Sequence, residues 1–136
     1  MEEDKNLKSL INFLVVEDDE AVRQLIVRRL RMEDFSGSIY EASDGQEALK
    51  IFSEQEIDII ICDWRIPLLN GIDFVNRVRS TYNSSKVAII MMSAETEMDK
   101  IELALNYGVD DYLTKPFTTQ DFREKLKKAI EKIKGR

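Results

Sequence analysis

Acidic residues occur directly after two apolar segments of this chain. Glu17 and Asp18 follow residues 13–16, and Asp63 follows residues 59–62. Two carboxylates about 5 Å apart repel each other by about 3 kcal/mol at an effective dielectric constant of about 20. A hard divalent cation removes that repulsion, and carboxylate, carbonyl and water oxygens are the ligands that suit Mg²⁺. The acids therefore predict a magnesium site, provided that the fold brings them together.

A hydroxyl and an amine follow two later apolar segments in the same way. Ser93 follows residues 86–92, and Lys115 follows residues 109–114. In phosphoryl transfer, a metal ion and a lysine neutralise phosphoryl oxygens, a hydroxyl hydrogen-bonds to one of them, and a carboxylate can be the nucleophile. We therefore predict a phosphoryl-transfer site with Asp63 as the nucleophile and the two earlier acids as metal ligands.

Each of these residues also has an ordinary structural interpretation. Acidic residues at a helix start cap free N–H groups, and we expect Asp19 to do this. Taken alone, Asp63 could equally be a turn residue that ends its strand, and Lys115 could be an exposed loop residue. The grouping of several acids with a lysine is what favours a site.

Five predicted strands must position these side chains. They lie at residues 13–16, 38–42, 59–62, 86–92 and 109–114. Helical patterns separate the strands, and a last helix follows the capping sequence at residues 118–121. This alternation predicts a parallel sheet with right-handed crossovers and helices on both faces. The carboxyl ends of all five strands then share one edge, which is where open α/β sheets bind ligands.

Length and composition limit the classes of protein that remain. The chain has 136 residues, enough for one domain, which we place at residues 11–136 after a flexible extension at residues 1–10. The 20 basic and 26 acidic residues give a net charge of −6, so the chain has no general attraction for nucleic acid or anionic membranes. It contains neither a signal-peptide pattern nor a run of transmembrane length, and we expect a cytoplasmic protein without membrane insertion.

The residue types exclude several kinds of chemistry. The sequence has no histidine, which rules out a Ser-His-Asp triad, a zinc-binding histidine pair and a histidine general base. Its one cysteine, Cys62, excludes an internal disulfide and fits a small buried core residue. Any chemistry must therefore come from carboxylates, lysine, hydroxyls and a bound metal.

Four segments at the ends of predicted strands carry a recognisable set of motifs. They are Phe13-Leu14-Val15-Val16-Glu17-Asp18, Cys62-Asp63-Trp64 with Pro67 and Gly71, Met92-Ser93-Ala94-Glu95, and Tyr112-Leu113-Thr114-Lys115-Pro116-Phe117. In these segments the chain resembles the receiver domains of two-component response regulators, in particular the stand-alone CheY-like type. The segments occur in the family's order and spacing over nearly the whole chain after residue 10. The resemblance implies a flavodoxin-like (βα)5 fold whose five-stranded parallel sheet has the order 2-1-3-4-5.

The resemblance also implies a phosphoacceptor and a set of metal ligands. Asp63 would accept a phosphoryl group from a phosphohistidine on a sensor histidine kinase or phosphotransfer protein. Glu17, Asp18, Asp63 and the main-chain carbonyl of Arg65 would hold Mg²⁺, for which Mn²⁺ could substitute.

A switch is implied as well. Ser93 would hydrogen-bond to a phosphoryl oxygen, Lys115 would pair with it, and Tyr112 would turn inward as Ser93 moves. The fourth helix, fifth strand and fifth helix after residue 10 would form the surface that binds a downstream target protein. For Tyr112, an edge-strand aromatic with a solvated hydroxyl is the alternative that the sequence leaves open.

Three residues depart from the commonest family pattern. Glu17 replaces the more usual aspartate and could hold the metal through water. Asn70 precedes Gly71 at a position where aspartate is common, although Asn-Gly favours the same backbone turn. The Arg65 side chain could pair with Glu95 or with the phosphoryl group and obstruct the attacking water, so both are expected modulators of dephosphorylation. We therefore expect slower self-dephosphorylation than in an Arg65→Asn variant.

These observations predict a single-domain phosphorylation switch that acts through protein partners, with chemotaxis as one expected output. We expect a monomer that could dimerise on phosphorylation, and a protein that assists its own phosphorylation and dephosphorylation without being a turnover enzyme. One alternative is a Mg²⁺-dependent phosphohydrolase. Such an enzyme is expected to have a second aspartate two residues after the nucleophile, where this chain has Arg65. Another is a flavodoxin-like electron carrier, whose phosphate loop would follow the first strand, where this chain is acidic.

Overall fold

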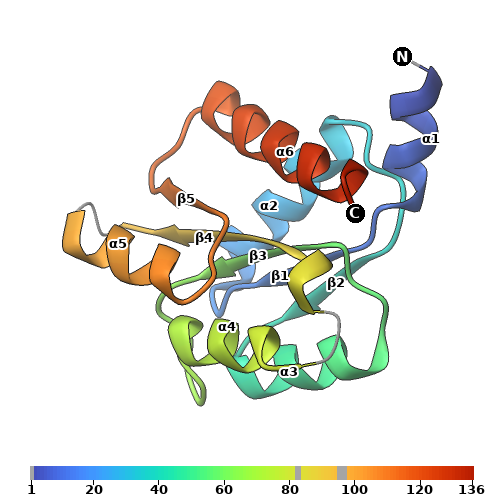
Figure 1. The fold of residues 1–136 in the computed structure, drawn as a ribbon. Coiled ribbons are helices and arrows are strands. Elements are labelled where there is room, and N and C mark those ends of the chain that lie inside the picture. The colour runs from blue at the N-terminus through green and yellow to red at the C-terminus, as the bar shows by residue number, and fades with distance from the viewer. Residues whose placement is uncertain (1, 82–83, 95–97) are drawn as a thin grey trace.

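The computed structural model describes residues 2–81, 84–94 and 98–136, and its centre is a five-stranded parallel sheet. The strands are β1 (Phe13–Val16), β2 (Ile39–Ala42), β3 (Ile59–Asp63), β4 (Ala88–Ser93) and β5 (Asp111–Thr114). Their order is β2-β1-β3-β4-β5, which confirms the predicted fold class (Figure 1).

Helices cover both faces of the sheet, as the alternating pattern predicts. They are α1 (Glu2–Leu10), α2 (Glu20–Met32), α3 (Gly45–Glu54), α4 (Gly71–Arg79), α5 (Met98–Asn106) and α6 (Thr119–Lys134), with a short 3₁₀ helix, η1 (Ser84–Lys86), before β4. Successive strand residues point to opposite faces, so Leu14 packs with α3, α4 and α5, whereas Phe13 packs with α2 and α6.

The register of the sheet brings the strand ends level with one another. Val16 pairs with Cys62, and Asp63 pairs with Met92. Ser93 in turn pairs with Thr114. The residues that follow β1, β3, β4 and β5 therefore lie along one edge of the sheet.

The N-terminal segment differs from the flexible extension expected at residues 1–10, because the structure has helix α1 there. Leu7 packs against the core cluster on the α2 and α6 face. The ammonium of Lys8 donates to the main-chain oxygen of Glu33 at 2.8 Å. Gly37 allows close approach to this segment, since a Cβ atom there would lie 2.2 Å from the Ile11 carbonyl oxygen. These contacts give the helix a packed position on the domain.

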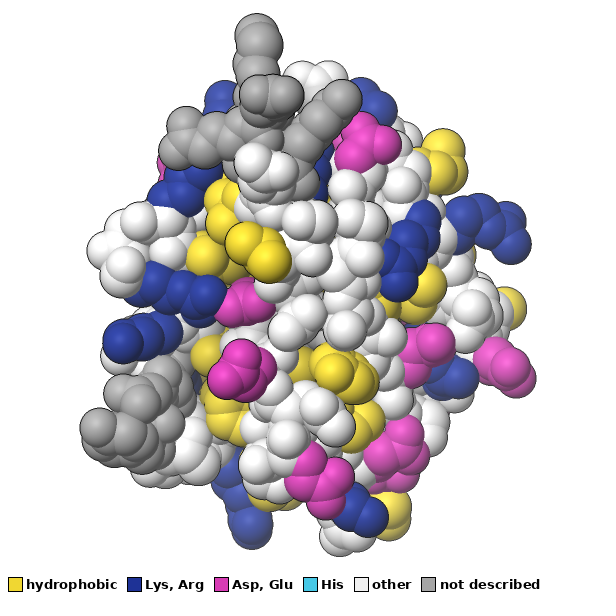
Figure 2. All heavy atoms as spheres, turned by 90° about the vertical axis from the view of Figure 1, so that its right-hand side faces the viewer, with side chains coloured by type: hydrophobic (Ala, Val, Ile, Leu, Met, Phe, Trp, Pro, Cys, Tyr) yellow, Lys and Arg dark blue, Asp and Glu magenta, His cyan; other side chains and the backbone are white. Residues whose placement is uncertain are grey.

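Figure 2 shows one side of the molecular surface, on which acidic and basic side chains are interspersed and hydrophobic side chains form separate small groups. Among the described residues, no helix combines the length and apolar character that crossing a membrane requires.

Candidate phosphoryl-transfer site

Buried polar side chains gather at the carboxyl edge of the sheet. Among the described residues, the buried polar ones are Glu17, Asp63 and Ser93, and each stands at or just after the end of a strand. Glu17 is 1% exposed although it carries a carboxyl group. Because an uncompensated buried charge is costly, these residues need partners.

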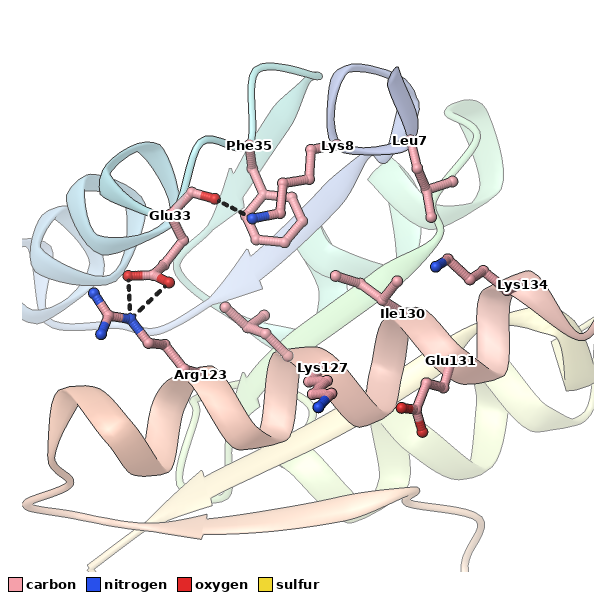
Figure 3. Close-up of a pocket in the computed structure, with 10 residues that line it drawn as sticks. Leu7, Lys8, Glu33, Phe35, Arg123, Lys127, Ile130, Glu131 and Lys134 are labelled. Carbon is pink, nitrogen blue, oxygen red and sulfur yellow. Dashed lines mark hydrogen bonds and ion pairs between the residues drawn. The ribbon is translucent and has the colours of Figure 1, made fainter. Parts of the chain in front are cut away.

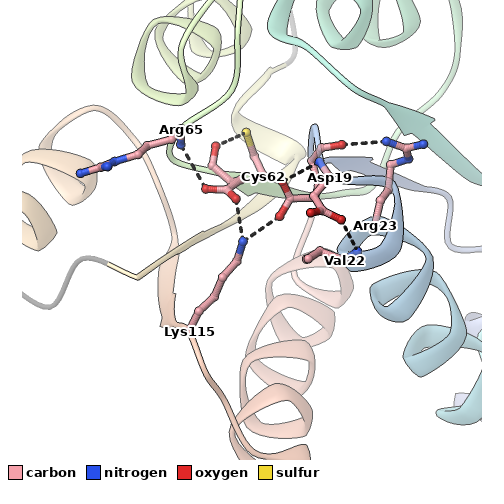
Figure 4. A network of polar contacts seen from close by, with 8 residues as sticks. Asp19, Val22, Arg23, Cys62, Arg65 and Lys115 are labelled. Carbon is pink, nitrogen blue, oxygen red and sulfur yellow. Dashed lines mark hydrogen bonds and ion pairs between the residues drawn. The ribbon is translucent and has the colours of Figure 1, made fainter.

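Lys115 is the partner of both buried acids. Its ammonium lies 2.7 Å from Glu17 Oε1 and 2.6 Å from Asp63 Oδ2 (Figure 4). The backbone N–H of Lys115 donates to the Ser93 main-chain oxygen at 2.8 Å, which places the lysine beside the end of β4. The peptide bond between Lys115 and Pro116 is cis, the form that the sequence allows at this position.

The start of α2 holds Glu17. The backbone N–H of Asp19 donates to Glu17 Oε2 at 3.3 Å, and Asp19 itself caps the helix by accepting from the backbone N–H of Val22. Arg23 donates to the main-chain oxygen of Glu17 at 2.9 Å and to the Glu41 carboxylate at 3.0 Å. The sequence analysis missed this role of Arg23, whose only signal was its place in the first turns of α2.

The loop after β3 holds Asp63. The backbone N–H of Arg65 donates to Asp63 Oδ1 at 3.1 Å, and that of Trp64 donates to the Met92 main-chain oxygen at 2.8 Å. Gly71 packs tightly on this loop, since a Cβ atom there would lie 2.7 Å from the Asp63 main-chain oxygen. The side chain of Arg65 is exposed and extends away from Lys115 (Figure 4).

The proton affinities of the site reflect burial and the crowding of acids. Burial, together with the neighbouring Asp63 and Asp18 carboxyls, raises the pKa of Glu17 from 4.5 to about 7, although the hydrogen bond from Lys115 opposes the shift. Burial acts to lower the pKa of Lys115, but its hydrogen bonds to Asp63 and Glu17 outweigh burial and raise it. Burial also raises the pKa of the Cys62 thiol. Glu17 is thus a group that a further cation would ionise fully at neutral pH.

The three carboxylates among the predicted metal ligands are placed differently. Glu17 and Asp63 are buried and share Lys115, whereas Asp18 is exposed. Within the described part of the chain, no three histidine, cysteine, aspartate or glutamate side chains form a ready-made metal cluster. The donors are nevertheless all oxygens, and Asp18 is near enough to raise the pKa of Glu17. This donor set fits a hard divalent cation.

The predicted switch residues flank the site. Ser93 is 2% exposed at the end of β4. Tyr112 lies on β5 with 8% of its surface exposed, and its ring meets that of Trp64 edge to face with a centroid distance of 6.5 Å. The tyrosine therefore points inward, unlike the solvated edge-strand alternative, and the sequence analysis did not foresee the contact with Trp64. Glu95 lies outside the residues that the structure describes.

A cavity of about 630 Å³ adjoins this edge of the sheet. Asp18, Trp64, Arg65, Asn70 and Tyr107 are among the residues that line it. The exposed carboxylate of Asp18 thus faces a space that a phosphodonor could enter.

Comparison with known proteins identifies a family whose sequence pattern spans most of this chain. Residues 13–127 match the model of the response regulator receiver domain. The chain is 34% identical over 125 residues to the chemotaxis protein CheY of Pseudomonas aeruginosa, with 92% of this chain and 100% of that protein covered.

Solved structures agree with the sequence relatives. The chemotaxis response regulator CheY4 of Vibrio cholerae aligns with a TM-score of 0.81 and 28% identity, over 88% of this chain and 98% of that one. A chain of the complex between the Saccharomyces cerevisiae phosphotransfer protein Ypd1 and the receiver domain of its response regulator Ssk1 aligns with a TM-score of 0.75 and 28% identity, over 86% of each chain. The sheet order, the family match and these relatives together show that the chain belongs to the response regulator receiver domain family.

Proposed function

We propose that Asp63 accepts a phosphoryl group and that the resulting acyl phosphate switches a protein-binding surface in two-component signalling. The observation that supports this most strongly is the position of Lys115, whose ammonium bonds to both buried carboxylates at the carboxyl edge of the sheet. A cation beside the nucleophile can neutralise the incoming phosphoryl oxygens.

In the proposed reaction, a carboxylate oxygen of Asp63 attacks the phosphorus of a phosphohistidine. The new P–O bond forms as the P–N bond breaks, and the imidazole nitrogen leaves with the bonding electron pair. The backbone N–H of Arg65 holds the other carboxylate oxygen of Asp63 in place. Lys115 would move its ammonium from the carboxylate to a phosphoryl oxygen, and Ser93 would donate a hydrogen bond to another.

A divalent cation is the expected cofactor, since receiver domains generally bind Mg²⁺. Glu17, Asp18, Asp63 and the main-chain carbonyl of Arg65 are the proposed ligands, with Mn²⁺ as an acceptable substitute. When bound, the ion would neutralise charge on the transferred phosphoryl group. Glu17 supports this assignment, because burial raises its pKa to about 7 and a bound cation would stabilise its ionised form.

The switch would act through the residues around Ser93 and Tyr112. An acyl phosphate adds charge and acceptor oxygens that draw Ser93 and Lys115 toward Asp63. Tyr112 lies on β5, and Lys115 directly follows that strand. The Tyr112 ring packs on Trp64, the residue next to the phosphoacceptor. Movement at the site would therefore change the surface formed by α5, β5 and α6, where we place the downstream target protein.

We propose protein partners and an autocatalytic role, with no turnover of external substrates. Receiver domains interact with histidine kinases or phosphotransfer proteins, as in the Ypd1–Ssk1 complex. Two-component signalling is the proposed setting. Chemotaxis is the proposed output because the CheY relatives are named chemotaxis proteins. A monomer that could dimerise on phosphorylation fits this role.

The decisive experiment is incubation with Mg²⁺ and acetyl phosphate, followed by location of the modified residue by mass spectrometry. We expect one phosphoryl group on Asp63, none in an Asp63→Asn variant, and none when EDTA removes the metal. Modification of a different residue would contradict the assignment. Sustained hydrolysis of a small phosphomonoester would instead support the phosphohydrolase alternative.

A further inference from the structure

Arg23 is bonded at two points to the acidic turn between β1 and α2. Its backbone N–H donates to the Asp19 main-chain oxygen at 2.9 Å. Its guanidinium donates to the Glu17 main-chain oxygen, also at 2.9 Å (Figure 4). One residue of α2 therefore binds the main chain both before and after Asp18.

The bond to Glu17 fixes a peptide unit at the point where the chain leaves the sheet. The backbone N–H of Glu17 donates to the main-chain oxygen of Ala42 at 3.0 Å, and β2 ends at Ala42. The Glu17 carbonyl follows this bond and takes the Arg23 guanidinium as its donor. That carbonyl belongs to the planar peptide that joins Glu17 to Asp18, so a bond that fixes its oxygen also restrains the backbone of Asp18.

Glu41 holds the guanidinium in place and offsets its charge. Arg23 Nε donates to Glu41 Oε1 at 3.0 Å, and the side-chain amide of Gln24 donates to the same oxygen at 2.6 Å. The Arg23 side chain is only 15% exposed, so solvent screens this ion pair incompletely. A guanidinium alone would repel a divalent cation at the acid pair, whereas one paired with Glu41 acts mainly through the geometry that it imposes.

The two acids differ in how firmly their side chains are held. Glu17 is buried and bonded to Lys115, whereas Asp18 is exposed. If both are to bind one cation, the Asp18 carboxylate must be ordered on the side of the buried glutamate. Ordering a side chain on binding costs affinity, and a restraint that exists beforehand reduces this cost.

We propose that Arg23 is a positioning residue for divalent-cation binding, because it orients the peptide between Glu17 and Asp18 so that both carboxylates can face one ion. This inference rests on the proposed function and adds to it a residue outside the proposed ligand set. Arg23 acts through the main chain of Glu17 and is itself held by Glu41.

The test is titration of the ¹⁵N-labelled protein with Mg²⁺, followed through the backbone amide shifts of residues 17–19 and 63–65. Arg23→Gln should weaken Mg²⁺ binding by about tenfold, the low end of the range typical of residues that orient metal ligands. Arg23→Lys keeps the charge without the planar set of donors, so its affinity should lie between those of the parent protein and Arg23→Gln. Unchanged or tighter binding in Arg23→Gln would overturn the inference.

The far end of α2 offers matched controls. There Arg31 donates to the main-chain oxygens of Phe35 and Gly37 at 2.9 and 2.8 Å. Lys8 donates to the main-chain oxygen of Glu33 at 2.8 Å (Figure 3). Arg31→Gln and Lys8→Gln remove the same kind of bond far from the acid pair, so both should bind Mg²⁺ as the parent protein does. Losses equal to that of Arg23→Gln would show a general effect on the helix and overturn the inference.

Phosphorylation by acetyl phosphate separates this inference from the proposed function. Arg23→Gln should need about tenfold more Mg²⁺ for half-maximal phosphorylation of Asp63 and should reach the parent rate when Mg²⁺ is saturating. Circular dichroism would establish that this variant folds, and Arg23→Lys supplies the same comparison if it does not. An unchanged Mg²⁺ requirement in a protein that is phosphorylated on Asp63 would overturn the inference alone. A parent protein that neither binds Mg²⁺ nor accepts the phosphoryl group would overturn the proposed function as well.

Discussion

Lys115 and Asp63 are 52 residues apart in sequence, yet the lysine ammonium lies 2.6 Å from Asp63 Oδ2. The same ammonium lies 2.7 Å from Glu17 Oε1, so one cation serves two buried acids. In effect the lysine stabilises the site before any metal or phosphoryl group arrives.

Replacing the lysine should destabilise the domain. In Lys115→Met, two buried carboxyl groups lose their cation, and the free energy of unfolding should fall by about 1–3 kcal/mol at pH 8 without metal. Urea unfolding followed by circular dichroism measures this change. Lys115→Arg keeps the charge and should lose less stability. Addition of Mg²⁺ should restore part of the loss in Lys115→Met, and a variant as stable as the parent protein would contradict the argument.

The pH dependence of stability should reveal the burial of Glu17. Its folded pKa of about 7 lies above its ordinary value of 4.5, so the folded state binds the proton more tightly than the unfolded chain. Its contribution to stability is therefore full below pH 4.5 and is lost as the pH rises through 7. Unfolding in urea at a series of pH values, in EDTA, should show this loss. Glu17→Gln should flatten the profile, whereas Glu20→Gln, which changes an exposed acid at the start of α2, should retain it.

Removing the exposed acid of the site should stabilise the metal-free protein slightly. Asp18→Asn or Asp18→Ala relieves repulsion of Glu17, and we expect a higher melting temperature corresponding to less than about 1 kcal/mol, because Asp18 is exposed. The same variants should lose Mg²⁺-dependent phosphorylation. Asp73→Asn, at the exposed start of α4, serves as the control and should not raise the melting temperature. An Asp18 variant that melts at or below the parent temperature would count against repulsion in the site.

The side chain of Arg65 should slow hydrolysis of the acyl phosphate. It extends away from Lys115 in the unphosphorylated structure, so the effect requires the guanidinium to turn toward the phosphoryl group (Figure 4). Arg65→Asn should then lose the phosphoryl group faster than the native protein, as measured by the decay of the phosphorylated form on mass spectrometry. Arg65→Lys separates the charge of the side chain from its shape. Equal or faster hydrolysis in the native protein would disprove the prediction.

Close packing at Gly71 should make the phosphoacceptor loop sensitive to one methyl group. A Cβ atom at this position would lie 2.7 Å from the Asp63 main-chain oxygen and 2.9 Å from that of Trp64. Gly71→Ala should therefore lower the free energy of unfolding by about 1–3 kcal/mol and slow phosphorylation. At Gly135 the nearest atom is 3.6 Å from the added Cβ, so Gly135→Ala should change stability little. Thermal unfolding of both variants and of the parent protein measures the two effects. Similar effects of the two substitutions would contradict the steric argument.

The sequence alone determined the fold class and the choice of candidate site residues. Strand and helix periodicity predicts the alternating order, because an element that buries one face must repeat apolar residues at its own period. The capping residues Asp19 and Thr118 were likewise readable, since a side-chain acceptor before a helix satisfies free N–H groups locally. Parallel strands then place Glu17, Asp63, Ser93 and Lys115 along one edge.

Only the tertiary structure decided how these side chains divide their contacts. The burial of Glu17, the exposure of Asp18, and the hydrogen bond from Arg23 to the Glu17 main-chain oxygen depend on the packing of α2 against the sheet. The inward position of Tyr112 depends on its contact with Trp64, which lies in the loop after β3. The packed position of helix α1 likewise depends on contacts with the segment after α2 and with the core on the α2 and α6 face. Local sequence patterns report local energies, whereas burial and pairing arise between residues that only the folded chain brings together.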